Sequence, residues 1–244
     1  MILNHIQENR NKGKKTFAVL IDPDKQSESS LIDLVKKLNQ KPGPDLILVG
    51  GSIVLNGIDQ TVALIKKNTA LPVILFPGNA LQFSTKADGI LFLSLISGRN
   101  PDFLIGNHVL SATRIKKSGI EVIPTGYILI NSGADTSVSY MSNTVPIPYQ
   151  KPEIAVATAI AGELLGLKLI YLEAGSGAPR PVSDEMIQAV KKNSSVPLIV
   201  GGGIKTPKQL ENVLKAGADM VVVGTAIEKD SSILTDFASI VSKS

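Results

Sequence analysis

The chain has 244 residues, of which 43% are hydrophobic, 19% charged and 4% aromatic, and its formal net charge is +4. The basic residues are scattered and do not interleave with aromatic ones, which argues against nucleic-acid binding and favours a small anionic substrate. There is no cysteine and there are two histidines, which excludes disulfides, thiol chemistry and three-histidine metal sites within one chain. The N-terminal segment is polar and no run of about 18 apolar residues occurs, so we expect a cytoplasmic protein without a membrane span.

Short apolar runs recur along the whole chain, and each has a length that suits a buried strand. They cover residues 16–21, 46–49, 72–76, 89–94, 121–130, 167–173, 196–200 and 218–224. The runs are continuous rather than alternating, which is typical of parallel strands buried on both faces. Eight is the number of strands in a closed (β/α)8 barrel. We therefore predict an α/β fold, a TIM-like barrel that residues 1–244 form as a single domain.

Helical patterns separate many of these runs. They cover residues 27–40, 59–68, 151–166, 183–193 and 206–217. The last of them has Thr206 as a candidate cap, Pro207 in the first turn and Gly217 as a terminator. A long segment rich in Ser, Asn and Pro, residues 131–150, follows the fifth run. In a barrel this segment is a loop on the face that carries the active site.

Glycine-rich stretches follow several strands directly. They read VGGS after the second run, EAGSG after the sixth, GGGI after the seventh and GT after the eighth. A tight turn explains any one of them, since glycine is the usual turn residue. In a barrel, however, these ends meet at one mouth, and the loops after strands seven and eight commonly form a phosphate site. We predict a phosphate site there, with Ser176 and Thr225 as hydroxyl donors.

Two carboxylates stand at strand ends near this predicted site. Asp22 follows the first run, where it could bind Mg²⁺, act as a general base, or cap an Asp-Pro turn. Ser52 follows the neighbouring strand and could reach the same metal, which favours the metal-binding alternative. Glu173 ends the sixth run, where it could accept a proton, orient a substrate hydroxyl, or bond to nearby loop N–H groups. We expect His108 to be structural.

The stretches LIDPDK, VGGS, IPTGYILIN, YLEAGSGAP, VGGGIKTP and VVVGTAIE together resemble the geranylgeranylglyceryl phosphate synthase family, which includes the heptaprenylglyceryl phosphate synthases. The resemblance runs from about Phe17 to Glu228. It implies a Mg²⁺-dependent prenyltransferase that joins the 3-hydroxyl of sn-glycerol 1-phosphate to C1 of geranylgeranyl diphosphate. Diphosphate is released, and the product is an ether lipid precursor in phospholipid biosynthesis.

The resemblance also implies roles for individual residues. Asp22 and Ser52 would hold Mg²⁺, and Glu173 would be the catalytic residue. The residues that would bind glycerol 1-phosphate are Tyr171, Leu172, Glu173, Ala174, Gly175, Ser176, Gly177, Gly202, Gly203, Gly224 and Thr225. Leu20 stands where one branch of the family has a lysine, so the chain resembles the other branch, which includes bacterial members.

Further expectations concern partners and alternatives. The family forms homo-oligomers, and its polyprenyl diphosphate substrate allows transient contact with a membrane surface. Candidates for the apolar prenyl groove are Ile53, Phe76, Phe92 and Tyr127. Rival interpretations are a phosphate-binding lyase or isomerase barrel, a heptaprenyl-specific member of the same family, and a catalytically silent barrel. The sequence leaves the prenyl length open.

Overall fold

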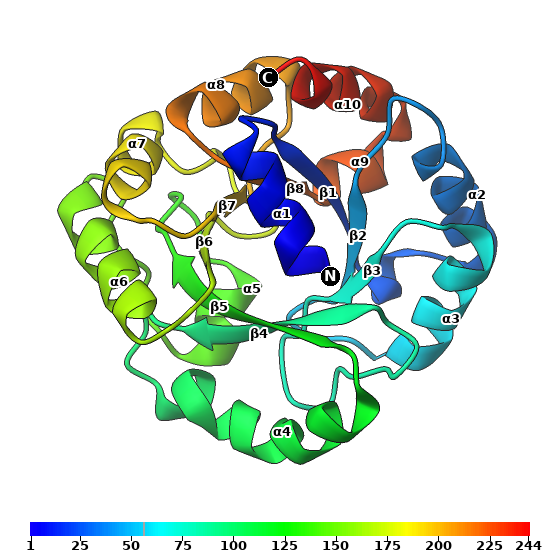
Figure 1. The fold of residues 1–244 in the computed structure, drawn as a ribbon, viewed down its shortest axis with the longest axis horizontal. Helices are drawn as coiled ribbons and strands as arrows, with labels where there is room; N and C mark the ends of the chain where they lie inside the picture. Colours follow the sequence, from blue (N-terminus) through cyan, green and yellow to red (C-terminus); the bar gives the residue numbers. More distant parts are fainter. Residues whose placement is uncertain (56) are drawn as a thin grey trace.

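The computed structural model describes residues 1–55 and 57–244, and eight parallel strands in it close into a barrel (Figure 1). The strands are β1 (Thr16–Ile21), β2 (Leu46–Val49), β3 (Val73–Leu75), β4 (Gly89–Leu95), β5 (Glu121–Leu129), β6 (Leu169–Glu173), β7 (Leu198–Gly201) and β8 (Met220–Val223). Neighbours in the barrel follow chain order, and β1 pairs with β8 to close it. The predicted (β/α)8 barrel is confirmed, with each strand inside or within one residue of its predicted run.

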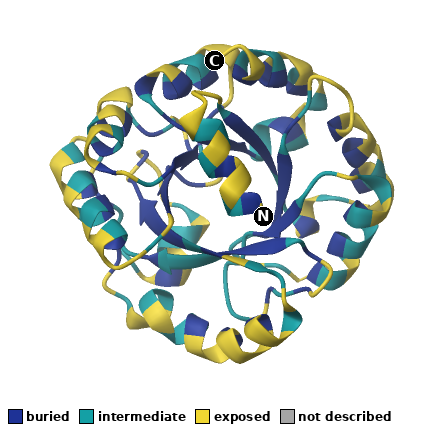
Figure 2. Ribbon diagram, viewed as in Figure 1, coloured by how far each residue is buried: buried dark blue, intermediate teal, exposed yellow. Residues whose placement is uncertain are grey.

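Helices surround the barrel and cover its outer face. They are α2 (Glu28–Leu38), α3 (Ile58–Asn68), α4 (Asn107–Ser118), α6 (Pro152–Leu164), α7 (Asp184–Asn193), α8 (Pro207–Ala216) and α10 (Leu234–Ser242). Figure 2 shows these helices buried on the side that faces the strands and exposed on the other. The Thr206 hydroxyl accepts the Gln209 N–H and caps α8, as the sequence predicted. Shorter elements are η1 (Pro23–Lys25), η2 (Asp102–Gly106), α5 (Ser137–Ser142), α9 (Thr225–Lys229) and η3 (Ser231–Ile233).

The core has two layers, because successive residues of a strand point to opposite faces. Side chains such as Ile170 and Leu172 pack between strands and helices. Others, such as Leu169 and Tyr171, fill the barrel interior. This alternation decides which residues of β6 can face a ligand inside the barrel.

The helix α1 (Ile2–Asn11) lies across one opening of the barrel, in front of the strands in Figure 1. Its Ile2 and Ile6 side chains are buried among the interior residues. The Leu3 N–H donates to Glu121, the first residue of β5, over 2.9 Å. Because α1 covers the opening at the N-terminal ends of the strands, ligand binding is directed to the opposite opening.

One connection departs from the expected alternation of strands and helices. Residues 76–88, all of which the structure describes, run from β3 to β4 without a helix. Pro77 and Gly78 follow β3 directly, and both disfavour a helix. The Gln82 side chain instead holds the segment, accepting the Gly78 N–H and donating to the Gly51 carbonyl over 2.7 Å. Among the described residues, no helix is long and apolar enough to cross a membrane.

Candidate active site

A cavity of about 490 Å³ opens at the C-terminal ends of the strands. Its wall includes residues from the loops that follow β1, β2, β6, β7 and β8. Of the candidate site residues, the cavity is lined by Asp22, Ser52, Tyr171, Glu173, Ser176, Gly177, Gly202, Gly203, Gly224 and Thr225. The two predicted halves of the site, the phosphate loops and the Asp22 region, therefore share one cavity.

Glu173 is the last residue of β6 and lies at the floor of this cavity. Its side chain is buried, and its Oε1 accepts the Gly175 N–H over 2.6 Å. Burial raises the pKa of this carboxyl to about 7, although the Gly175 N–H and the Tyr171 and Tyr127 hydroxyls favour its charged form. A carboxyl with this pKa exchanges a proton readily near neutral pH, as a general base requires.

An aromatic cluster lies beside Glu173. The Tyr171 ring stacks on Phe76 with 5.5 Å between ring centroids, and the Tyr127 centroid is 5.3 Å from that of Tyr171. Burial and the nearby Glu173 charge raise the pKa values of both tyrosines well above their usual range, so both stay neutral. The Tyr171 hydroxyl is electrostatically coupled to Glu173 but has no hydrogen-bond partner of good geometry among the described residues.

The glycine loops allow a close approach of backbone to the Glu173 carboxylate. Gly202 has a φ of +79°, and a Cβ there would collide with Glu173 Oε1 and with the Gly175 backbone. On the far side of the same loops, the Ser176 and Thr225 hydroxyls lie 3.1 Å apart. They join the loop after β6 to the start of α9. Glycines, backbone N–H groups and two hydroxyls thus form a cradle of the kind that binds phosphate.

Three of the predicted glycerol phosphate residues lie behind this cradle. The Leu172 and Ala174 side chains are fully buried in the layer between strands and helices. Gly175 is committed to its hydrogen bond with Glu173 and packs against Thr136. None of the three is among the residues that line the cavity, so they support the loop from outside.

Asp22 follows β1 and lies between the loop after β2 and the helix α9 that follows β8. Its carboxylate is 3.3 Å from the position of a Cβ on Gly51, next to Ser52. No three His, Asp or Glu residues converge as a metal cage in the part of the chain that the structure describes. Mg²⁺ commonly takes one or two carboxylates and completes its shell with substrate phosphates. The donor set of one carboxylate and one hydroxyl fits this pattern.

Two charged residues of the same wall were not among the candidates. The Lys25 Nζ lies 3.2 Å from Asp22 Oδ2, and Glu228 Oε1 accepts the Asp22 N–H over 3.1 Å. Both side chains line the cavity. Burial raises the pKa of Glu228, although the Asp22 N–H and Lys25 oppose that shift. The signal for Glu228 was available in the sequence, because it stands three residues after Thr225, one helical turn on.

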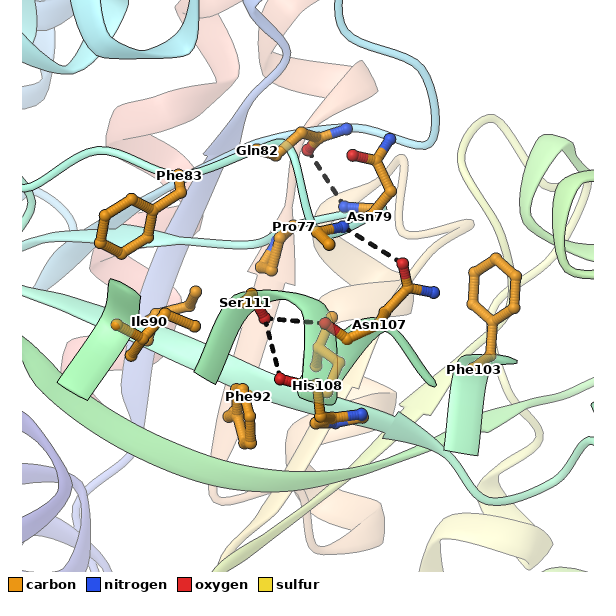
Figure 3. A pocket seen from close by; sticks show the side chains of 14 residues that line it. Pro77, Asn79, Gln82, Phe83, Ile90, Phe92, Phe103, Asn107, His108 and Ser111 are labelled. Carbon is orange, nitrogen blue, oxygen red and sulfur yellow. Dashed lines mark hydrogen bonds between the residues drawn. The ribbon is translucent and has the colours of Figure 1, made fainter. Parts of the chain in front are cut away.

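His108 lies away from this cavity, as expected for a structural residue. Its Nε2 is 3.2 Å from the Ser94 hydroxyl, and its ring meets Phe92 edge-on at 4.4 Å. Burial lowers its pKa, so it is neutral. With Phe92 and Asn107 it lines a separate pocket of about 60 Å³ under the β3–β4 segment (Figure 3).

The sequence model of the PcrB family matches residues 6–241. The chain belongs to the PcrB family. Among curated relatives, the geranylgeranylglyceryl phosphate synthase of Spirosoma linguale is 52% identical over 94% of this chain and 92% of its own. The enzyme of the same name from Pyrococcus abyssi is 46% identical over 94% of this chain and 90% of its own.

A solved member has nearly the same structure. It is (S)-3-O-geranylgeranylglyceryl phosphate synthase from Thermoplasma acidophilum, crystallised in complex with its substrate sn-glycerol-1-phosphate. The two structures superpose with a TM-score of 0.94 and 31% identity, covering 100% of this chain and 99% of the other. The resemblance seen in the sequence motifs is thereby confirmed over the whole barrel.

Proposed function

We infer that this PcrB-family chain is a prenyltransferase that joins the 3-hydroxyl of sn-glycerol 1-phosphate to geranylgeranyl diphosphate. The product is geranylgeranylglyceryl phosphate, with diphosphate as the leaving group. The observation that carries this function is the T. acidophilum complex, which holds sn-glycerol-1-phosphate in a barrel of the same structure. The identities to enzymes of this name at 52% and 46% support it.

We propose that the phosphate of glycerol 1-phosphate binds in the cradle after β7 and β8. Gly202, Gly203 and Gly224 bring backbone close to the ligand there, and the Ser176 and Thr225 hydroxyls are available as donors. Backbone N–H dipoles, rather than a strand-one lysine, would supply the positive potential that attracts the phosphate, because Leu20 occupies that position and packs against Gly224. The glycerol backbone then extends from the cradle toward the cavity floor.

This placement directs the 3-hydroxyl to Glu173. The carboxylate accepts the hydroxyl proton while the glycerol oxygen forms a bond to C1 of the prenyl chain. The C1–oxygen bond to diphosphate breaks, and its electron pair leaves with the diphosphate. We propose that the Tyr171 hydroxyl, which lies beside Glu173, also donates to this oxygen and orients it.

The leaving group belongs at the neighbouring part of the cavity wall, after β1 and β2. We propose that Asp22 and Ser52 hold Mg²⁺ there, and that the ion when bound neutralises the charge that develops on diphosphate. Asp22 supplies the charged ligand and Ser52 a neutral one. This part of the wall and the cradle border the same cavity, and β1 pairs with β8, so the two substrates would lie side by side.

The prenyl tail requires an apolar surface that leads away from this wall. Of the four candidates, Ile53, Phe76 and Tyr127 line the main cavity. Phe92 lines the smaller pocket, where Figure 3 shows it with Phe83, Ile90 and Phe103. Both pockets border the β3–β4 segment, where the barrel has no covering helix. We propose that the tail follows this side of the barrel.

One incubation tests the function. The protein is mixed with Mg²⁺, sn-glycerol 1-phosphate and labelled prenyl diphosphates of different lengths, and butanol-soluble products are identified by mass. We expect geranylgeranylglyceryl phosphate as the main product. Folded protein that forms no ether product with any prenyl length would refute the function, whereas a heptaprenyl product would correct only the chain length.

We further propose a homo-oligomer with transient contact to a membrane surface. Exposed apolar side chains on the β3–β4 segment and on α4, namely Leu81, Val109 and Leu110, support such contacts. Light scattering of the purified protein tests the first proposal, and flotation with lipid vesicles tests the second.

A further inference from the structure

A linked set of charged groups lies on the Asp22 wall of the cavity. Lys25 Nζ is 3.2 Å from Asp22 Oδ2 and 3.5 Å from Glu228 Oε2. The other oxygen of Glu228 accepts the Asp22 N–H over 3.1 Å. Glu228 has 8% of its side chain exposed, Asp22 19% and Lys25 45%. The buried carboxylate therefore anchors the set, and the ammonium is its accessible member.

The barrel closure brings these residues together. Asp22 follows β1 and Glu228 belongs to α9, which follows β8, and β1 pairs with β8 through Val19 and Val223. The same short helix begins at Thr225 in the phosphate cradle. Glu228 thus connects the wall that carries Asp22 to the element that carries Thr225.

The charges of the set do not cancel. Two carboxylates face one ammonium, so the group carries an excess negative charge that a further cation can balance. The Lys25 ammonium contacts Asp22 Oδ2, while Asp22 Oδ1 accepts the Asp24 N–H over 3.2 Å. If Asp22 Oδ2 held a metal ion, Lys25 would leave that oxygen, and Glu228 Oε2 would keep the ammonium within the cavity wall. Diphosphate oxygens would be strong partners for an ammonium held there.

We propose that Lys25 binds the diphosphate group of the prenyl substrate and that Glu228 is the positioning residue that holds both Lys25 and the Asp22 backbone. This rests on the function proposed above and adds two residues to its second substrate site. In this structure, the Lys25 ammonium is the positive charge beside Asp22. In the complex, it turns to the leaving group, whose negative charge grows as the C1–oxygen bond breaks.

The binding test uses inorganic diphosphate with Mg²⁺ as the probe, titrated by calorimetry into the wild type and variants. Lys25→Met should weaken diphosphate binding about tenfold or more. It should leave the affinity for sn-glycerol 1-phosphate within about twofold, and Lys25→Arg should restore most of the loss. Lys67→Met is the matched control, since Lys67 is exposed in the last turn of α3 and its loss changes the net charge equally.

The positioning role of Glu228 has its own readout. Glu228→Gln keeps an oxygen for the Asp22 N–H but loses the ion pair, so diphosphate affinity should fall less than in Lys25→Met. The KM for prenyl diphosphate should rise in both variants, while the KM for glycerol phosphate should not. Melting temperatures identify any variant that fails to fold, and Lys25→Arg then stands as the second test.

Two outcomes would overturn the proposal. If Lys25→Met binds Mg²⁺–diphosphate as tightly as the wild type, Lys25 does not contact diphosphate. If Lys25→Met loses affinity for both substrates equally, the role of Lys25 is structural. These results differ from a failure of the proposed function, in which the wild type itself forms no ether product although its binding of diphosphate can still be measured.

Discussion

The carboxylate of Glu173 occupies the space beside Gly202 that a side chain at that position would take. The pairing of β6 with β7 sets this relationship, because Glu173 lies opposite Gly201 in the register and Gly202 follows at once. The Glu173 carboxylate and the glycine loop after β7 are therefore fitted to each other, and a change in either one alters both.

Gly202→Ala is expected to disturb catalysis and stability together. The added Cβ would collide with Glu173 Oε1 and the Gly175 backbone, and the φ of +79° strains any L-residue. We expect kcat/KM to fall at least tenfold and the unfolding free energy to drop by more than about 1 kcal/mol. Enzyme kinetics and denaturant titration measure the two effects.

The matched control is Gly119→Ala. Gly119 has a φ of +74°, but a Cβ there would meet nothing within 4 Å. It should lose about 1 kcal/mol from backbone strain and keep its activity. Equal activity losses in both variants would contradict the fit between Gly202 and Glu173.

Tyr171→Phe separates binding from folding. Because the Tyr171 hydroxyl favours only the charged form of Glu173, its removal should leave the melting temperature unchanged at a pH well below the Glu173 pKa of about 7. If it donates to the bound glycerol hydroxyl, kcat/KM should fall about tenfold. A variant with wild-type kinetics would show that this hydroxyl takes no part in the reaction.

The rate should depend on pH through Glu173. Its pKa is about 7 because it is buried, and a base must be deprotonated to accept a proton. We expect kcat to rise with pH through about 7 and to level off above it. Because the Tyr171 hydroxyl favours the charged form of Glu173, the midpoint in Tyr171→Phe should move to higher pH. If kcat does not change between about pH 5.5 and 8.5, a range that brackets the Glu173 pKa, proton transfer to Glu173 is contradicted.

The raised pKa of Glu173 should also make the stability of the protein depend on pH. The folded pKa of about 7 lies above the unfolded value of about 4.3, so folding favours protonated Glu173. This contribution is fully present below the unfolded pKa and is lost as pH rises through the folded pKa. At pH 8 the buried charge should cost on the order of 3 kcal/mol.

Glu173→Gln should therefore be more stable than the wild type at pH 8, with a difference that shrinks toward pH 5. Gln keeps an oxygen that can accept the Gly175 N–H. Denaturant titrations at the two pH values measure the difference. If Glu173→Gln is destabilised equally at pH 5 and pH 8, Glu173 serves chiefly to hold the loop that follows β6.

The barrel could be predicted because each strand is a continuous apolar run between polar segments. The helix α10 was overlooked although it buries Leu234, Phe237, Ala238 and Val241. The helices α1 and α4 were not predicted either, since each buries few side chains: Ile2 and Ile6 in α1, and His108, Ser111 and Ile115 in α4. Their apolar periodicity is accordingly weak. The missing helix after β3 was also overlooked, although Pro77 and Gly78 stand where it would begin.

The candidate site divides in the same way. Glu173, Asp22 and the glycine loops could be predicted because each follows a strand directly, and strand ends of a barrel meet at one mouth. The contact between Asp22 and Glu228 could not, since it joins residues 206 positions apart and depends on the closure of β1 on β8. The Leu172 side chain points away from the barrel interior because successive residues of β6 face opposite sides. The sequence motif alone does not say which residues face the interior.

The most direct test of the account compares wild type and Glu173→Gln in one assay. Both are given Mg²⁺, sn-glycerol 1-phosphate and labelled geranylgeranyl diphosphate, and the ether product is followed by mass and rate, with glycerol phosphate affinity measured separately. The wild type should form geranylgeranylglyceryl phosphate, and Glu173→Gln should turn over about 10²–10⁴-fold more slowly with nearly unchanged affinity. Near-normal turnover by Glu173→Gln would contradict the role of Glu173 as a base, and no product from the wild type would contradict the proposed function.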